Sequence, residues 1–463
     1  MKKNTLIAVI SIFSFGISIA QNTDILKEVT KNYILGKLEP AKVEMDKVMA
    51  IPTNATNPEL LIWSIAINAE IINDTTKNKK YPNLINDWLN DFKKYESLDP
   101  TYTQMSSAMI GWKPLAIMYN KFFNHGIQFF QKEKWSEAFE NFTQLAHLAK
   151  VIMKKDLKKN GGALDTIPFL YSGYSAQNAR KTDDALHYYS FLIDNNYSSD
   201  KDLDIYLYML GNYIEKKDKA NFDKYLTIAK EKYPKEDFEG YQLEFIAKNM
   251  DIDEKIEYYD LEDAKGTLTG NAYSTFGDNF AAYKKTESED NETGIAKSKL
   301  VLSKAIDAFK KAYEKSKNVL SAFNAGVLMY NTFTEFDDAY RDNVRSMQII
   351  NSSKPNEKDP KKRAAIEVKV KEQIEPLKKT NAEIETKMNS IADDSVIWLE
   401  ITANTLKDQT EKSRVEATSY KNSVKYLGQL FEYKREKAKA KDPKAYDAFD
   451  AKSKLYFGVF DKL

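Results

Sequence analysis

The side chains best suited to bind a metal or move a proton are the three histidines, His125, His147 and His187. Two histidines that share a metal on one helix stand four residues apart, because both rings must project from the same face. The histidines of this chain are separated by 22 and 40 residues, so no pair has that spacing. The sequence therefore predicts ordinary packing or helix-surface histidines and no metal site.

Adjacent carboxylates are the next candidates, because paired acids perform general acid and base catalysis. The pairs are Asp183-Asp184, Glu262-Asp263, Asp337-Asp338 and Asp393-Asp394. Glycoside hydrolysis requires two carboxylates that face each other across a cleft of roughly 5–10 Å, and neighbours on one helix do not do so. Most of these pairs are expected near helix starts, where the positive end of the helix dipole favours acids.

Other catalytic signatures are missing from the sequence as well. It contains no cysteine, which excludes thiol nucleophiles, disulfides and zinc–thiolate sites. It contains no G-x-S-x-G, H-E-x-x-H or phosphate-loop motif, and its turns at Asn160-Gly161-Gly162 and Thr269-Gly270-Asn271 follow no strand. Because no residue set nominates a reaction, we expect a protein that is not an enzyme and that uses no cofactor.

The first twenty residues have the organisation of a cleavable signal peptide. Lys2 and Lys3 form a positive start, residues 6–19 are mostly apolar, and Ser18-Ile19-Ala20 is a small-x-small cleavage site. A helix of that length rises roughly 21 Å, short of the roughly 30 Å core of a bilayer. We expect cleavage after Ala20, no transmembrane anchor, and a periplasmic or secreted protein; the alternative is an uncleaved helix.

The charge pattern argues against nucleic acid as a partner. Loss of Lys2 and Lys3 takes the formal net charge from +1 to −1, and the charged 30% of residues have interspersed signs. Nucleic-acid binding needs a basic patch or stripe. The nearest basic run, residues 434–444, is interrupted by Glu436 and Asp442 and is better explained as a solvated helix face.

Helices are the elements expected to position any binding residues, because apolar residues recur at intervals of three and four and strand patterns are nearly absent. A longer pattern joins pairs of helices: a glycine, an alanine twelve residues later, and an aromatic residue four further on. It occurs in Gly126, Ala138 and Phe142; in Gly173, Ala185 and Tyr189; and, with a longer first gap, in Gly277, Ala305 and Phe309. The pattern predicts helical hairpins in which the glycine allows the second helix to approach closely.

This arrangement resembles the tetratricopeptide repeat, a helix pair of about 34 residues with aromatic and small residues at set positions. Matching units begin at Phe122, Phe169, Leu207 and Tyr273; a further unit opens at Asn324-Ala325-Gly326 and continues through Met329 and Ala339; a divergent one runs from Trp63 to Leu98-Asp99-Pro100. The resemblance implies an all-α fold, an α-α superhelix of stacked hairpins. Because successive units are 38 to 66 residues apart, we expect the superhelix to be irregular.

The repeats divide the chain into five parts. Residues 1–20 are the signal peptide, 21–110 divergent N-terminal hairpins, 111–268 regular repeats, 269–350 repeats with an enlarged turn, and 351–463 long helices with a capping helix. The enlarged turn holds the acidic segment 286–293, which is expected to be a solvated loop. Residues 351–362 are expected to form a connection, and the helix after them to be kinked or restarted near Pro376.

The resemblance also implies a binding face, because in this family the first helices of successive units line a concave surface. Transfer of that face through the glycine alignment gives Asn120, Phe123, Ile127, Phe130, Gln131, Leu170, Tyr174, Gln177, Asn178, Tyr208, Asn212, Phe323, Tyr330 and Asn331. Aromatic side chains interspersed with amides suit an extended peptide, whose backbone groups the amides pair with. The other interpretation is that these aromatic side chains pack against the next unit.

The sequence thus predicts an exported, non-catalytic scaffold that binds protein partners of the cell envelope or secretion machinery. The alternative is a glycan-binding component of a polysaccharide uptake system, because aromatic side chains also stack on sugar rings. Helical-repeat proteins of that kind are typically lipid-anchored through a cysteine, which this chain lacks. A helical hydrolase is a third hypothesis, and it would require a clustered histidine or acid pair.

Overall fold

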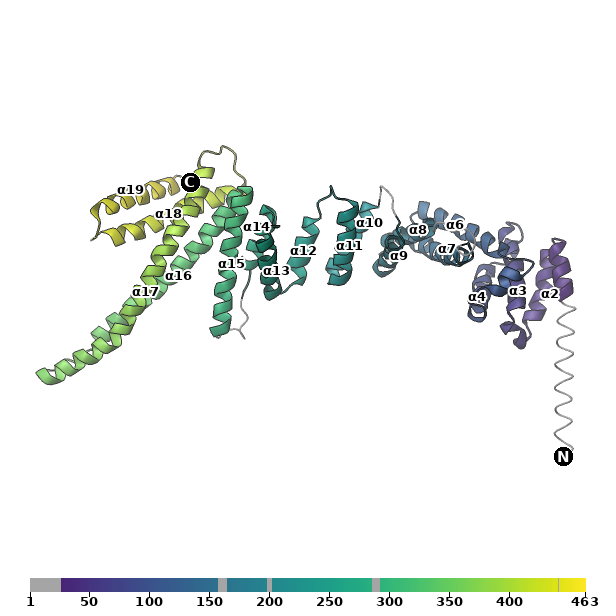
Figure 1. Cartoon of the computed structure of the whole chain (residues 1–463), viewed down its shortest axis with the longest axis horizontal. Helices are drawn as coiled ribbons and strands as arrows, with labels where there is room; N and C mark the ends of the chain where they lie inside the picture. The colour runs from purple at the N-terminus through teal and green to yellow at the C-terminus, as the bar shows by residue number, and fades with distance from the viewer. Residues whose placement is uncertain (1–25, 157–164, 198–201, 285–291, 440) are drawn as a thin grey trace, which may run out of the picture. The chain divides into compact units, whose positions relative to one another are not determined.

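The computed structural model describes residues 26–156, 165–197, 202–284, 292–439 and 441–463, and its regular elements in these ranges are helices joined by turns (Figure 1). No strand occurs within these ranges, which confirms the predicted all-α class. The predicted signal peptide lies outside them, and so does most of the acidic segment 286–293. In the described ranges, no helix is both long and apolar enough to cross a membrane.

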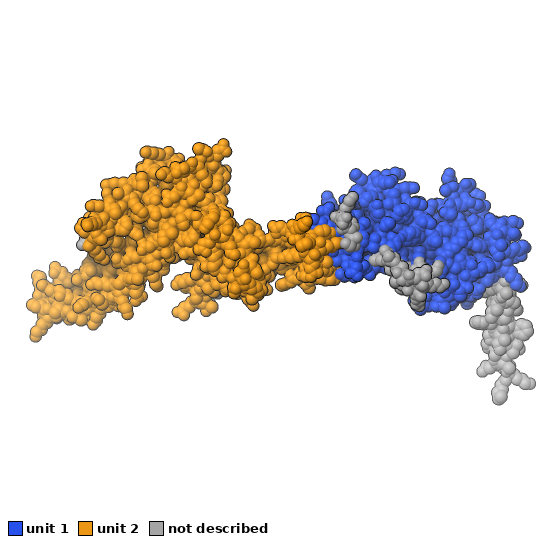
Figure 2. All heavy atoms as spheres, turned by 45° about the horizontal axis from the view of Figure 1, so that its top comes forward, with its two compact units in different colours: residues 1–212 blue, residues 213–463 orange. Residues whose placement is uncertain are grey.

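The chain forms two compact units, residues 1–212 and 213–463, which are coloured separately in Figure 2. Unit 1 contains α2 (Leu38–Met49), α3 (Pro58–Asn73), α4 (Leu84–Leu98), α5 (Thr103–Ser107), α6 (Lys113–Gln131), α7 (Trp135–Asp156), α8 (Ile167–Asn178) and α9 (Thr182–Asp194), with residues 26–34 and two 3-10 turns, Pro52–Thr56 and Asn78–Lys80. The division falls within α10 (Leu203–Glu215), between Asn212 and Tyr213.

Unit 2 continues with a further series of helices. They are α11 (Lys219–Lys232), α12 (Glu239–Asn249), α13 (Ile252–Lys265), α14 (Gly270–Ala281), α15 (Glu292–Ser316), α16 (Val319–Ser352), α17 (Pro360–Lys407), α18 (Arg414–Ala438) and α19 (Pro443–Phe460), of which α16 and α17 are the longest. In both units, helices that are neighbours in the sequence pack on each other; the pairs include α6 with α7, α7 with α8, α8 with α9, α14 with α15, and α16 with α17.

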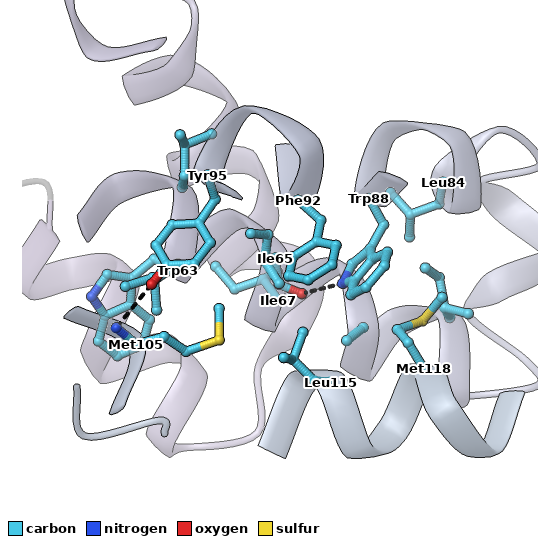
Figure 3. Packing of buried hydrophobic residues seen from close by; sticks show 14 of the residues in the cluster. Trp63, Ile65, Ile67, Leu84, Trp88, Phe92, Tyr95, Met105, Leu115 and Met118 are labelled. Carbon is cyan, nitrogen blue, oxygen red and sulfur yellow. Dashed lines mark hydrogen bonds between the residues drawn. The ribbon is translucent and has the colours of Figure 1, made fainter. Parts of the chain in front are cut away.

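The N-terminal core of unit 1 is built from large side chains of α3, α4 and α6 (Figure 3). Trp88 is fully buried, and its indole Nε1 donates a hydrogen bond to the backbone oxygen of Ile65 at 3.1 Å. Tyr95 is also fully buried, and its hydroxyl accepts a hydrogen bond from the backbone N–H of Met105 at 3.0 Å. Both polar atoms are therefore satisfied inside an otherwise apolar core, which removes the cost of burying them.

Asp99 closes this part of unit 1 at the turn after α4, where Leu98-Asp99-Pro100 predicts the end of a helix. Its carboxylate accepts hydrogen bonds from the Tyr95 hydroxyl at 2.6 Å and from the backbone N–H groups of Gln104 at 2.8 Å and Thr103 at 3.1 Å. Burial by itself would raise the pKa of Asp99, but these hydrogen bonds outweigh it and lower the pKa below its ordinary value. Asp99 thus stays ionised and ties α4 to α5.

The predicted glycine and aromatic pairs meet as close contacts between helices. A Cβ atom built on Gly126 would lie 2.7 Å from the ring of Phe142, and one built on Gly277 would lie 2.7 Å from the ring of Phe309. The ring of Tyr189 lies against Gly173 in the same way. A side chain at any of these three glycines would overlap the ring, so the glycine is what permits the short interhelical distance.

Two further helix pairs, both in unit 2, use the same contact with serine in place of alanine. Gly326 of α16 lies against Leu399 of α17, and the Ser395 hydroxyl, four residues before Leu399, donates to the Gly326 carbonyl at 2.9 Å. Gly428 of α18 lies against Phe457 of α19, and the Ser453 hydroxyl donates to the Gly428 carbonyl at 3.0 Å. The close glycine contact therefore continues to the C-terminal end of unit 2.

The turns after α6, α8 and α10 also repeat one conformation. Each has a non-glycine residue with positive φ, namely Glu133 (56°), Arg180 (60°) and Lys217 (57°). The residue after it donates its backbone N–H to a carbonyl five positions back: Lys134 to Phe129 at 2.9 Å, Lys181 to Ala176 at 2.8 Å, and Asp218 to Tyr213 at 3.0 Å. This is the Schellman arrangement, which pairs the last carbonyls of a helix before the chain reverses.

The structure differs from the sequence predictions at three places. Gly211 has no atom within 4 Å of a Cβ built on it, so it lacks the close contact with a ring that Gly126, Gly173 and Gly277 make. Ala339 was expected to belong to a second helix, but α16 runs unbroken from Val319 to Ser352 and contains it. Of the two predictions at Pro376, a kink or a restart, the restart does not occur, because α17 continues through it, with Ile374 and Met388 buried on either side.

Candidate functional site

The binding residues predicted in unit 1 are placed by α6, α8 and α10, and all of them are exposed or partly buried. Asn120, Gln131 and Asn178 are exposed, and none of the others is fully buried. A face with this degree of exposure is open to a ligand at its amides and partly open at its aromatic rings. The individual contacts decide which of these side chains serve packing.

The aromatic residues predicted on α6 serve mainly to hold unit 1 together. The ring of Phe130 lies 5.1 Å from Trp135 and 5.2 Å from Tyr171 of α8, both in edge-to-face geometry. Phe123 and Ile127 pack against the unit 1 core. These contacts agree with the second interpretation of the sequence, in which such residues join one hairpin to the next.

The residues predicted on α8 and α10 come together around one buried tyrosine of α9. Tyr189 is fully buried, and its ring lies 6.0 Å from that of Tyr174 and 5.8 Å from that of Tyr208, both nearly perpendicular. Its hydroxyl donates to Oε1 of Gln177 at 2.6 Å. We call Tyr174, Tyr189, Tyr208 and Gln177 the tyrosine cluster. Tyr174, Tyr208 and Gln177 were predicted from the sequence as binding residues, and the fully buried Tyr189 contacts all three.

Two asparagines, one on α8 and one on α10, carry free acceptor capacity beside the tyrosine cluster. Nδ2 of Asn178 donates to the backbone oxygen of Tyr174 at 2.8 Å, and Nδ2 of Asn212 donates to that of Tyr208 at 2.8 Å. Each bond fixes the amide on its own helix by a donor. Because a primary amide also has an acceptor oxygen, both side chains keep the group that pairs with a peptide N–H.

Burial raises the pKa of two hydroxyls of the tyrosine cluster, those of Tyr174 and Tyr189. Burial raises the pKa of Tyr189, and the neighbouring Tyr174 and Tyr208 raise it further. The pKa of Tyr174 is raised by burial first and then by Tyr197 and Asp204. Both hydroxyls are therefore neutral, and that of Tyr174, which is partly exposed and near the carboxylate of Asp204, can donate a hydrogen bond to a ligand.

The predicted residues of unit 2 lie on α16, where α18 covers part of them. The ring of Tyr330 stacks on Tyr426 with centroids 4.2 Å apart, and its hydroxyl donates to Gln429 at 2.7 Å. Phe323 packs against the C-terminal core, whereas Asn331 is exposed. Tyr330 lines a cavity of about 540 Å³ together with Phe333, Arg341, Tyr433 and Arg435. Of the three predicted residues, only Asn331 is freely exposed.

A larger cavity in unit 2, of about 700 Å³, has no counterpart in the sequence predictions. The end of α11, the helices α12 and α13, and the loop before α14 line it, and Lys230, Glu239, Gln242, Tyr258 and Glu262 supply polar groups. None of the binding residues predicted from the sequence lies in this region. The lining residues come from four separate segments and share no periodic pattern, so a single sequence offered no signal for the cavity.

Groups able to carry out catalysis remain scattered. His147 pairs with Glu96 at 2.7 Å, and burial together with Lys121 lowers the pKa of His125. Among the residues that the structure describes, no three histidine, aspartate or glutamate side chains gather closely enough to hold a metal ion. The most developed arrangements are therefore the tyrosine cluster of unit 1 and the large cavity of unit 2.

No family model and no curated protein matches the chain.

Proposed function

We propose that the protein is a non-catalytic scaffold that binds an extended segment of a partner protein. Its hairpins form an irregular α-α superhelix of the tetratricopeptide type, and its partners belong to the cell envelope or the secretion machinery. The close contacts at Gly126, Gly173, Gly277, Gly326 and Gly428 and the repeated turn after α6, α8 and α10 support the repeat architecture. The predicted signal peptide supports the compartment.

The observation that carries the proposal is the tyrosine cluster with its flanking amides. Tyrosine offers a large, rigid contact area with a hydroxyl at its end, a combination enriched at protein interfaces. Asn178 and Asn212 keep acceptor oxygens for the N–H groups of a bound chain. Because two helices present the set and one buried tyrosine supports it, the surface is formed before the ligand arrives, which reduces the entropy cost of binding.

Photo-crosslinking tests the surface directly. We expect a photoreactive residue placed at Asn178 to capture a protein partner that the same residue at Asn195 does not capture. Asn195 is a matched control, because it is also exposed at the end of a helix and also donates to its own helix, to Phe191 at 2.7 Å. Capture of the same proteins from both positions would contradict the proposed surface.

The affinity of the purified partner then measures the contribution of the tyrosines. Replacing Tyr174 and Tyr208 together by alanine is expected to weaken binding by about 2 kcal/mol or more, about thirtyfold, as for interface tyrosines in general. Tyr241→Ala, at a partly buried tyrosine of α12, should leave the affinity unchanged. Calorimetry with a panel of polysaccharides covers the alternative: glycan binding that requires Tyr174 and Tyr208, in the absence of a protein partner, would replace the scaffold proposal.

A further inference from the structure

The large cavity of unit 2 has an apolar floor. Phe238, Leu243 and Ile246 of the α12 region are buried, with 2%, 8% and 3% of their surfaces exposed, and Leu268 lies beside them. The ring of Tyr258, which lines the same cavity, stacks on Phe276 at 5.9 Å. A volume of about 700 Å³ over such a floor has the size of a ligand site and accepts a long side chain together with part of its backbone.

The rim of the cavity is acidic. Glu236, Asp237, Glu239 and Glu262 lie on it, and Lys230 is the one basic residue among those that line it. The ammonium of Lys230 donates to Oε1 of Gln242 at 2.9 Å, and Gln242 in turn bonds the hydroxyl of Tyr258. Lys230 also attracts Glu262 electrostatically, and Lys265 pairs with Glu262, so the four carboxylates exceed these two cations and leave net negative charge around the opening.

Two of these carboxylates are held in place by hydroxyl and amide groups. Glu239 accepts hydrogen bonds from the Thr269 hydroxyl at 2.6 Å and from Nδ2 of Asn271 at 3.1 Å. Glu262 accepts from the Thr267 hydroxyl at 2.6 Å and pairs with Lys265 at 2.8 Å. Since a carboxylate has about four acceptor positions, both groups have capacity left for a further donor. Fixed orientation means that a bound cation does not have to order them.

We propose that this cavity binds an arginine or lysine side chain presented by a segment of a partner protein. The aliphatic stem lies on the floor formed by Leu243 and Ile246, and the cationic head meets the carboxylates of the rim. Long basic side chains bury their stems on apolar surface and keep their charge at a polar boundary, which matches this lining. The inference rests on the proposed function only in taking the occupant to be a protein segment.

Fluorescence anisotropy with the full chain tests the inference. The probe is a labelled peptide of glycine, serine and arginine, and its partner probe carries citrulline, the neutral isostere, at each arginine. We expect the arginine peptide to bind at least about tenfold more tightly than the citrulline peptide. We also expect Glu239→Gln with Glu262→Gln to weaken binding of the arginine peptide by about tenfold.

Matched variants separate the cavity from general attraction of charge. Glu244→Gln with Glu257→Gln makes the same change of charge on α12 and α13 at exposed positions outside the cavity, and it should leave binding unchanged. Glu236→Lys alters an exposed loop residue of the rim and should abolish binding without disturbing a helix. Circular dichroism of each variant establishes that it is folded.

Equal binding of the arginine and citrulline peptides would overturn the inference, and so would equal loss in the cavity and control variants. The tyrosine variant Tyr174→Ala with Tyr208→Ala should bind the arginine peptide as the unmodified protein does. If it does not, the peptide binds at the tyrosine cluster and the cavity is not its site. Failure of the peptide to bind therefore leaves the crosslinking result at Asn178 to decide the proposed function.

Discussion

The turn after α8 and the turn after α10 have the same conformation, but only the helix before the first of them has a close glycine contact. In both, a left-handed residue, Arg180 or Lys217, precedes a backbone hydrogen bond that closes the helix end. The ring of Tyr189 lies against Gly173, whereas Gly211 has no atom within 4 Å of the place where its Cβ would be. The boundary between the compact units falls one residue after Gly211. The same turn conformation therefore occurs with and without a close glycine contact in the helix before it.

Truncation of Tyr189, which lies against Gly173, and of Leu226 of α11 should test this comparison most strongly. Tyr189→Ala removes a fully buried ring and is expected to cost about 3–5 kcal/mol of unfolding free energy, as for large aromatic residues in cores. Leu226→Ala, at the corresponding position of α11, should cost less, about 2 kcal/mol, since no glycine contact is lost with it. Urea unfolding followed by hydrogen exchange of each helix measures both. Equal losses would show that the glycine contact contributes nothing particular.

Substitution of the turn aspartates Asp99 and Asp218 should lower the free energy of unfolding by different amounts, and the effect at Asp99 should depend on pH. Asp99→Asn loses charge-assisted hydrogen bonds in a buried turn, at a cost of about 1.5–3 kcal/mol, whereas Asp218→Asn changes a helix cap and should cost about 1 kcal/mol or less. Because the pKa of Asp99 is lowered on folding, its contribution is complete above the unfolded value of about 4 and is lost as the pH falls through the folded value. Unfolding of unit 1 at pH 7, 4 and 3 should therefore show a smaller fall for Asp99→Asn than for the unmodified protein. Parallel curves would refute a role for its charge.

Alanine at the two glycines should give the smallest changes, with opposite signs. Gly173→Ala pushes a methyl group into the ring of Tyr189, and after the gain in helix propensity we expect a net loss of about 1–2 kcal/mol. Gly211→Ala meets no atom, so the propensity gain of about 0.5–1 kcal/mol should appear as added stability. Thermal unfolding of both variants, with Gly277→Ala as a second tight case, measures the signs. A loss of stability in Gly211→Ala would contradict the open environment described for it.

The parts of the fold that could be predicted from the sequence are those whose partners are close along the chain. Gly126 and Phe142 are sixteen residues apart, so one short turn brings them together and a fixed spacing reveals them. Gly326 and Leu399 form the same contact across 73 residues, with serine in place of alanine, and no spacing rule finds them. The same limit explains Ala339, because nothing local states that α16 continues past the position where a repeat helix would end.

The candidate sites divide in the same way. Tyr174, Gln177 and Tyr208 could be placed on one face by helical periodicity, and the structure brings them around Tyr189. Phe130 satisfied the same rule but packs between hairpins, because exposure depends on the next helix and not on the spacing. The floor and rim of the cavity in unit 2 come from different segments of the chain. The spacing of residues within one segment carries no information about how such segments come together.

The serine-to-glycine hydrogen bond has a consequence for the long pair α16 and α17. Two long helices that pack only through apolar side chains can shift along each other by a turn or a heptad. In coiled coils, buried polar residues prevent such shifts. Here the Ser395 hydroxyl fixes the Gly326 carbonyl, and further along the pair Asn381 bonds both Asn343 at 2.8 Å and the Tyr340 carbonyl at 3.2 Å. Polar contacts at two separate points along the helix pair select one axial alignment. We therefore expect a force applied to one end of the α16–α17 pair to be transmitted along the pair without one helix sliding on the other.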